Sequence, residues 1–153
     1  EGRAPAALDS LSRGAPVAEV RDVLSKIPVA HRVALARRAQ TNERRFLRHD
    51  PDPLVLESLV RNPNIVLPEI IALARTPLLL PSTVEIMAGD PRWAASDELK
   101  LLLATHPRAS FSTVDKLVAR LGDIMLQRVI HRPGLNPAVR EKVMRKLSRK
   151  NRG

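Results

Sequence analysis

The sequence predicts an all-α protein, a right-handed α-solenoid of short stacked helices. The main signal is a polar residue followed by proline, which recurs through the middle of the chain. These dipeptides are Asp50-Pro51, Asn62-Pro63, Thr76-Pro77, Asp90-Pro91, His106-Pro107 and Arg132-Pro133. Their prolines lie 12, 14, 14, 16 and 26 residues apart, and each interval carries apolar residues with helical spacing. Because proline disfavours a helical conformation in the residue before it, each dipeptide predicts the end of a short helix. Helices of about two turns are marginal alone and need stacked neighbours.

Composition supports a folded chain with an aliphatic core. The 153 residues are 44% hydrophobic but only 2% aromatic, so we expect a core of Leu, Ile, Val and Ala. There is no cysteine, which excludes disulfides and thiolate metal sites and is typical of a cytoplasmic protein. No apolar run approaches the roughly 18 residues of a membrane span. We predict one helical-repeat domain over residues 16–149, between a flexible tail or linker (1–15) and a basic tail (150–153).

The chain before the repeating part is expected to hold two helices. The tail is rich in Ala, Pro, Gly and Ser, and we expect it to be ordered only where Leu8 and Leu11 find a groove. Pro16 begins the first helix, and Pro28 separates the two. Their apolar stripes are Val20, Val23, Leu24 and Ile27 in the first helix, and Val29, Val33 and Ala36 in the second.

The repeating part combines a capping residue, an apolar stripe and a stop seven times. The expected helix starts are Asp52, Pro68, Ser82, Asp97, Ser112, Asp123 and Asn136. Ser, Asp and Asn accept hydrogen bonds from the first free N–H groups of a helix, and proline is favoured at the first helical position. Gly89 lies where a helix C-cap is expected. Agreement among these signals supports the helical prediction more strongly than any single one.

Four stretches resemble bacterial HEAT-like and leucine-rich-repeat-variant helical proteins over about residues 30–147. They are LRHDPDPLVLESLVRNPNI, IIALA, PRWAASDELKLLLATHP and LQRVIHRPGLNPAVREKV. The resemblance implies a fold rather than an activity. It points to a branch without the iron–sulfur cysteines that some variants carry, because this chain has no cysteine. A second departure is His106, which stands where a second Asn-Pro is expected.

The sequence carries no recognisable catalytic or metal-binding motif. Its histidines are His31, His49, His106 and His131, and they lie far apart without paired metal-ligand spacing. His49 beside Asp50 and Asp52 is a weak candidate for a metal site or general base, and an interaction with helix-terminal carbonyls explains it better. There is no phosphate-binding glycine loop or Gly-x-Ser-x-Gly elbow. We therefore expect no enzyme activity, no cofactor and no metal.

Positive charge gathers at the two ends of the chain. The net charge of +10 divides into +4 for residues 1–50, −3 for 51–100 and +9 for 101–153. The candidate anion- or partner-binding residues are Arg37, Arg38, Arg44, Arg45, Arg48, Arg140, Lys142, Arg145, Lys146, Arg149 and Lys150. Each cluster has a second interpretation: a solvated helix face and turn for the first, and a charged cap of a repeat array for the last. Trp93 is either a cover between repeats or an interaction anchor.

Two functions are compatible with these features. The first is a scaffold for protein–protein interaction, with an acidic protein as partner. The second is a module that binds DNA or RNA through phosphates, with steep salt dependence. The scarcity of aromatic residues argues against base stacking and so against sequence-specific binding of single strands. Oligomeric state does not follow from the sequence.

Overall fold

The structure is a computed structural model that describes residues 6–150. In this range all regular elements are helical, with eleven α-helices, one 3-10 helix and no strand. The predicted all-α class is therefore confirmed. Contacts divide the chain into two compact units, the first extending to Leu73 and including Leu78–Leu80, the second comprising Ala74–Pro77 and the chain from Pro81. The single domain expected over residues 16–149 stays a prediction.

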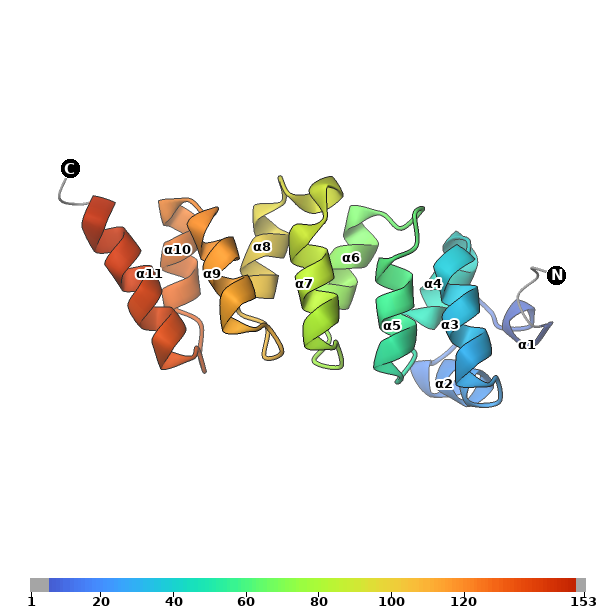
Figure 1. Ribbon diagram of the computed structural model, residues 1–153. Helices are drawn as coiled ribbons and strands as arrows, with labels where there is room; N and C mark the ends of the chain where they lie inside the picture. Colours follow the sequence, from blue (N-terminus) through green and yellow to red (C-terminus); the bar gives the residue numbers. More distant parts are fainter. Residues whose placement is uncertain (1–5, 151–153) are drawn as a thin grey trace. The chain divides into compact units, whose positions relative to one another are not determined.

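The first unit is built around helix α3. It contains α1 (Ala6–Asp9), α2 (Val17–Ser25), α3 (Val29–Arg38), α4 (Thr41–Leu47), α5 (Pro53–Val60) and most of α6 (Leu67–Ala74) (Figure 1). Helix α3 packs against α4 and α5, which also contact each other. Leu35, Leu47 and Leu56 are buried there. A buried ion pair, with 2.6 Å between Arg32 Nη1 and Asp50 Oδ1, lies beside this core.

Part of the segment expected to be a flexible tail is folded onto the first unit. Helix α1 contacts α2, and the side chains of Leu8 and Leu11 are buried. These two leucines contribute apolar surface to the unit, which explains why this Ala- and Pro-rich segment is packed. Residues 1–5 of the expected tail and 151–153 of the expected basic tail lie outside the described residues.

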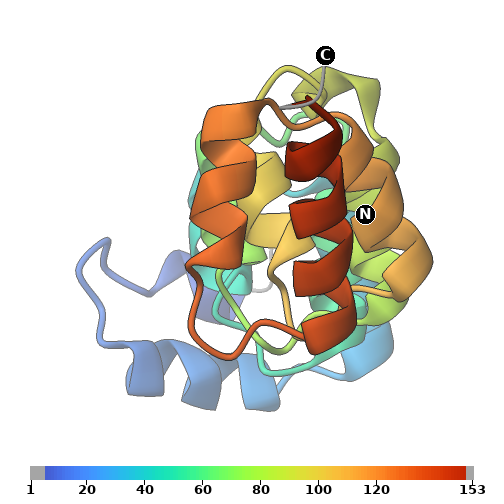
Figure 2. The ribbon, with the colours of Figure 1, turned by 90° about the vertical axis from the view of Figure 1, so that its left-hand side faces the viewer.

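The second unit arranges its helices in two rows. It contains α7 (Pro81–Gly89), the 3-10 helix η1 (Pro91–Trp93), α8 (Asp97–Ala104), α9 (Phe111–Ala119), α10 (Asp123–Ile130) and α11 (Pro137–Lys150). Helices α7, α9 and α11 contact one another in that order, and α8 contacts α10 (Figure 1). Sequential helices such as α10 and α11 also lie side by side, as the view onto this end shows (Figure 2). Alternate helices therefore share a row within this unit.

A repeated turn explains why the polar-proline dipeptides end helices. At four of these dipeptides the side chain before proline accepts a hydrogen bond from the backbone N–H two residues later, at 2.8–3.0 Å; the accepting residues are Asp50, Asn62, Asp90 and His106. Asp52 and Asn136, also followed by proline, accept the same kind of bond at the starts of α5 and α11. Proline fixes its own φ and holds the preceding residue extended, which keeps this short bond within reach. Helices α4, α5, α6, α7, α8 and α10 all end within three residues of a polar-proline dipeptide, as predicted.

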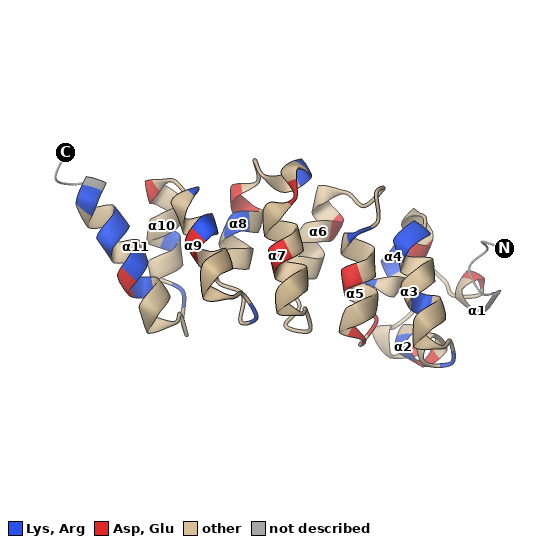
Figure 3. Ribbon diagram, in the orientation of Figure 1, with Lys and Arg blue, Asp and Glu red and all other residues tan. Residues whose placement is uncertain are grey.

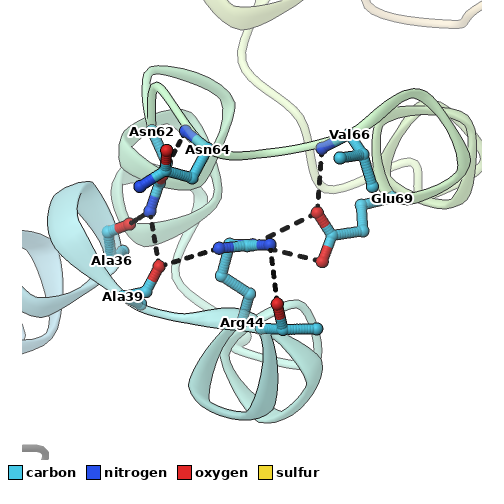
Figure 4. Close-up of polar contacts among 8 residues, drawn as sticks. Ala36, Ala39, Arg44, Asn62, Asn64, Val66 and Glu69 are labelled. Carbon is cyan, nitrogen blue, oxygen red and sulfur yellow. Dashed lines mark hydrogen bonds and ion pairs between the residues drawn. The ribbon is translucent and has the colours of Figure 1, made fainter.

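Asn62 also connects its turn to the preceding helices of the first unit. Its Nδ2 donates to the carbonyl oxygens of Ala36 and Ala39, each at 2.9 Å (Figure 4). The Ala39 oxygen accepts a further bond from Arg44 Nη1 at 2.9 Å. Buried polar groups are costly unless hydrogen-bonded, so this network satisfies the backbone where α3 ends.

Four local predictions differ from the structure. Helix α6 begins at Leu67, one residue before the expected Pro68. Helix α9 is capped by Ser110, whose Oγ accepts the Thr113 N–H at 3.2 Å, and not by Ser112, which lies inside the helix. Helix α7 begins at Pro81, one residue before the expected Ser82. The segment at Thr41, interpreted as a turn, starts helix α4. Propensity signals locate helices well but place their first residue poorly.

Candidate partner-binding groove

The last helix, α11, packs against α9 and α10 of the second unit. Val139 and Val143 are buried in an apolar cluster with Leu126 and Val129 of α10. Arg140 Nη1 donates to the carbonyl oxygen of Ile130, the last residue of α10, at 2.6 Å. Lysines and arginines recur along α11 (Figure 3); Arg140, Arg145 and Arg149 are exposed, whereas Lys142 and Lys146 are half-buried. An amphipathic helix with this pattern buries its aliphatic stripe and displays its charges.

A groove of about 300 Å³ lies between α9 and α11. Its lining is formed by Asp115, Val118 and Ala119 from α9 and by Lys142, Arg145, Lys146 and Arg149 from α11. The cations come from successive turns of one helix, because residues three and four apart share a helical face. The α9 side contributes aliphatic surface and one carboxylate. We refer to this site as the α9–α11 groove.

Two carboxylates hold cations of the groove in ion pairs. Lys142 pairs with Asp115, and Arg145 pairs with Glu141 one turn earlier in α11. The Arg145–Glu141 pair is well exposed, with about two-thirds of each side chain accessible (68% and 65%). Exposed pairs of this kind contribute only about 0–1 kcal/mol to stability. Both cations are therefore available to an incoming anion at small cost.

Lys142 and Lys146 make further contacts with α9. The Lys142 ammonium lies 5.0 Å from the centre of the Phe111 ring, a cation–π distance. Lys146 Nζ donates to the carbonyl oxygen of Val118 at 2.5 Å, near the end of α9. The Phe111 side chain is 55% exposed, so an apolar surface borders the cations at this end.

A second depression, of about 580 Å³, lies on α11 itself. It is lined by Pro137, Arg140, Glu141, Met144, Arg145, Ser148 and Arg149. Arg145 and Arg149 line both depressions, so they form the ridge between them. The second unit as a whole contains 15 Lys and Arg against 7 Asp and Glu, a net charge of +8, whereas the first unit has 11 against 9.

The other candidate residues of α11 differ in exposure. Arg140 and Arg149 are exposed, and Lys142 and Lys146 are half-buried against α9. The side chain of Lys150 lies outside the described residues, although its backbone ends α11.

The arginines of the first unit differ in exposure. Arg37, Arg38 and Arg48 are exposed and Arg45 is half-buried. Arg44 differs from the expectation, because it is buried, with 5% of its surface accessible.

Arg44 is held by an internal polar network. Its Nε lies 3.1 Å from both carboxylate oxygens of Glu69, and its Nη2 donates to Thr41 Oγ1 at 3.3 Å (Figure 4). Glu69 Oε2 also accepts the Val66 N–H. Arg44 therefore stabilises the junction of α4 and α6 and is not part of an exposed anion-binding edge. Arg44 and Glu69 line a small cavity of about 200 Å³ together with Arg45 and Arg48.

Trp93 does not serve as an exposed anchor. Its side chain is buried in η1, and the Arg92 guanidinium lies 4.7 Å above the indole ring. Arg92 also hydrogen-bonds the Asp90 carboxylate, which lowers the pKa of Asp90 below its usual range. The interpretation of Trp93 as a residue that fills space between helices fits this burial, whereas the anchor does not.

The histidines are spread over separate environments. Partial burial, Arg48 and Arg21 lower the pKa of His49 below its ordinary value. Asp50, the candidate partner of His49, is held by Arg32 instead. Among the described residues, His, Asp and Glu side chains nowhere gather in threes that could hold a metal ion. In that same part of the chain, no helix is both long and apolar enough to cross a membrane.

Sequence reasoning identified the cations of α11 but missed Phe111, Asp115 and Val118 as their neighbours. Phe111 and Asp115 lie 31 and 27 positions before Lys142, and Val118 lies 28 positions before Lys146, so no local motif relates them to α11. Only the packing of alternate helices brings them together.

Comparison of the chain with protein-family models, curated proteins and solved structures gives no match.

Proposed function

We propose that the chain is a non-enzymatic helical-repeat scaffold that binds an acidic protein partner. The repeat class proposed is the right-handed α-solenoid of HEAT-like or leucine-rich-repeat-variant type. Two observations support it: polar-proline turns recur along the chain, and alternate helices pack on each other within the second unit. Repeat arrays of this kind use their surface grooves to bind other chains. A cytoplasmic location stays a prediction from the cysteine-free composition.

The α9–α11 groove is the observation that carries the proposed function. It combines four cations with apolar surface from the exposed Ala119 and, beside Lys142, the exposed ring of Phe111. A peptide with carboxylates and apolar side chains matches both parts, because carboxylates pair with Lys and Arg while apolar groups gain from burial. Charge complementarity of this kind also accelerates association and selects among partners.

A phosphate-directed nucleic-acid binder is the second candidate. The net charge of +8 on the second unit supports it, because cations outside the groove also contribute. Arg128 and Arg132, in and after α10, are both exposed and line neither depression of α11. A phosphate backbone that contacts many cations depends on all of them and is released steeply by salt.

A binding experiment separates the two candidates. Fluorescence anisotropy would measure the affinity of the full chain for a labelled peptide of glutamate and leucine, and for a labelled DNA duplex. The double variant Arg145→Glu, Arg149→Glu changes the ridge that lines both depressions. We expect it to weaken peptide binding by at least about tenfold, since two substitutions lower the net charge next to the ligand by four.

The matched control is Arg128→Glu, Arg132→Glu, which makes the same charge change outside the groove. The scaffold proposal requires this control to leave peptide affinity within about twofold of the original chain. Equal losses for both double variants, together with tighter binding of the duplex, would transfer the assignment to nucleic acid. Absence of peptide binding by the unmodified chain at low salt would overturn the proposed function.

A further inference from the structure

Resting on the proposed function, we infer that Asp115 and Glu141 act as internal competitors in the α9–α11 groove. Each carboxylate forms an ion pair with a cation that an acidic ligand would bind: Asp115 pairs with Lys142, and Glu141 pairs with Arg145. The occupant that fits is an acidic protein segment carrying apolar side chains. It binds by replacing these two carboxylates with its own.

The exposure of the two pairs makes such an exchange inexpensive. Lys142 and Asp115 keep 35% and 47% of their side chains accessible, and the Arg145–Glu141 pair is more exposed still. A ligand carboxylate therefore replaces one solvated ion pair by another, without breaking a buried contact. Neither carboxylate caps its helix, since Ser110 caps α9 and Asn136 begins α11. The exchange leaves both helix starts intact.

The apolar part of the segment has a defined place at Phe111. This ring is exposed, and it lies next to Lys142, the lysine that also pairs with Asp115. A ligand leucine on the Phe111 ring buries apolar surface while its neighbouring carboxylate reaches Lys142. A nucleic-acid backbone would use the cations but gain nothing from an aliphatic contact of this kind. The pairing of Phe111 with Lys142 thus favours the acidic-apolar peptide.

The length of α9 also sets a minimum length for the bound acidic segment. Helix α9 has 9 residues, and at about 1.5 Å per residue the helix is about 13 Å long. An extended peptide covers this distance in about four residues. A peptide with about two acidic and two apolar residues is therefore the shortest ligand that spans the length of α9.

The first test removes the competing carboxylates. Asp115→Asn and Glu141→Gln each keep the shape of the side chain and release one cation. We expect each to tighten binding of a glutamate–leucine peptide by about two- to fivefold, which is the effect of losing one exposed pair. The matched control is Glu98→Gln, which breaks the exposed Arg75–Glu98 pair elsewhere in the second unit and should change affinity by less than about 1.5-fold.

The second test separates the apolar contact from charge. Phe111→Ala should weaken the glutamate–leucine peptide by about threefold or more and leave an all-glutamate peptide of equal length unchanged. Ile124→Ala, which removes another exposed apolar side chain from α10, should affect neither peptide. Circular dichroism of each variant confirms that the helices are retained.

The outcomes distinguish this inference from the proposed function. If Arg145→Glu with Arg149→Glu abolishes peptide binding but Asp115→Asn and Glu141→Gln do not tighten it, internal competition is wrong and the scaffold function stands. If Phe111→Ala weakens both peptides equally, or a DNA duplex binds more tightly than either, the acidic-apolar occupant is wrong. If no peptide binds to the unmodified chain, both proposals fail together.

Discussion

The His106 side chain makes the same two kinds of hydrogen bond as the Asn62 side chain. Each accepts the backbone N–H two residues later and also reaches a backbone carbonyl oxygen far away in the sequence. The Nδ1 of His106 accepts the Arg108 N–H at 3.0 Å, and its Nε2 lies 2.8 Å from the Thr76 carbonyl oxygen. Because a carbonyl only accepts and a backbone N–H only donates, the neutral ring must carry its hydrogen on Nε2. An amide side chain offers the same acceptor and donor. The departure from Asn-Pro at this position is therefore a substitution of equivalent hydrogen-bonding groups.

This equivalence predicts the effect of two substitutions at His106. His106→Asn should keep the free energy of unfolding within about 1 kcal/mol of the original chain, since both hydrogen bonds have a replacement. His106→Leu should lower it by about 1–3 kcal/mol, because the Thr76 carbonyl and the Arg108 N–H lose a partner. Urea denaturation measures both. Equal destabilisation by Asn and Leu would show that the ring contributes through its shape alone.

His49 predicts how stability depends on pH. Partial burial, Arg48 and Arg21 keep the pKa of His49 below the ordinary 6.5 in the folded chain. Below that pH the unfolded chain takes up this proton more readily than the folded chain does, so the free energy of unfolding falls as pH decreases through this range. Urea denaturation at about pH 7.5 and 5.5 should show a smaller decrease for His49→Gln than for the original chain. His31→Gln, at an exposed position, serves as the control.

At the scale of elements, the start of α9 distinguishes two candidate caps. Ser110 accepts the Thr113 N–H, whereas Ser112 is exposed within the first turn. Ser110→Ala should lower the free energy of unfolding by about 1 kcal/mol, as loss of an N-cap does. Ser112→Ala should be neutral or slightly stabilising, because alanine has the higher helix propensity. Thermal unfolding followed by circular dichroism compares the two, and the reverse order would contradict the cap assignment.

The lengths of the helices also show that the polar-proline dipeptides keep them short. Helices α5 to α10 have 8 or 9 residues each, and polar-proline dipeptides separate most of them. The long interval before Pro133 contains two helices, α9 and α10, which Gly122 separates instead of a proline. Isolated helices of this length are unstable in water, so packing against neighbours determines whether they form.

At the scale of the whole molecule, charge is unequally divided between the two units. The second unit carries +8, and like charges on a compact body repel one another. Raising sodium chloride from about 0.05 to 0.5 M should screen this repulsion and raise the urea concentration that unfolds the second unit. Trp93, the single tryptophan, is buried there, so its fluorescence follows this unit.

A variant with a lower net charge tests whether charge repulsion causes this salt effect. Arg128→Glu with Arg132→Glu lowers the charge of the second unit by four and should reduce the salt dependence of its unfolding. Urea is the appropriate denaturant because guanidinium is itself a salt. A salt dependence that is unchanged in this variant would show that screening of net charge is not its cause.

The sequence by itself determined the helical class and most helix ends. Proline constrains the backbone of its own and the preceding residue, and a polar side chain before it caps the turn, so these signals are local. The buried stripes of α2, α5, α9 and α10 follow likewise from residues three and four apart. Helix α4 escaped sequence reasoning because its seven residues include only Phe46 and Leu47 as apolar members.

Only the tertiary structure decided which charged residues face solvent. Arg44 and Arg45 are adjacent and chemically identical, yet the first is buried against Glu69 and the second is only half-buried. Likewise, Asp115 reaches Lys142 because α9 and α11 share a row, a contact between residues far apart in the chain. Helical periodicity assigns a residue to a face of its own helix, but the neighbour that covers that face is set by long-range packing.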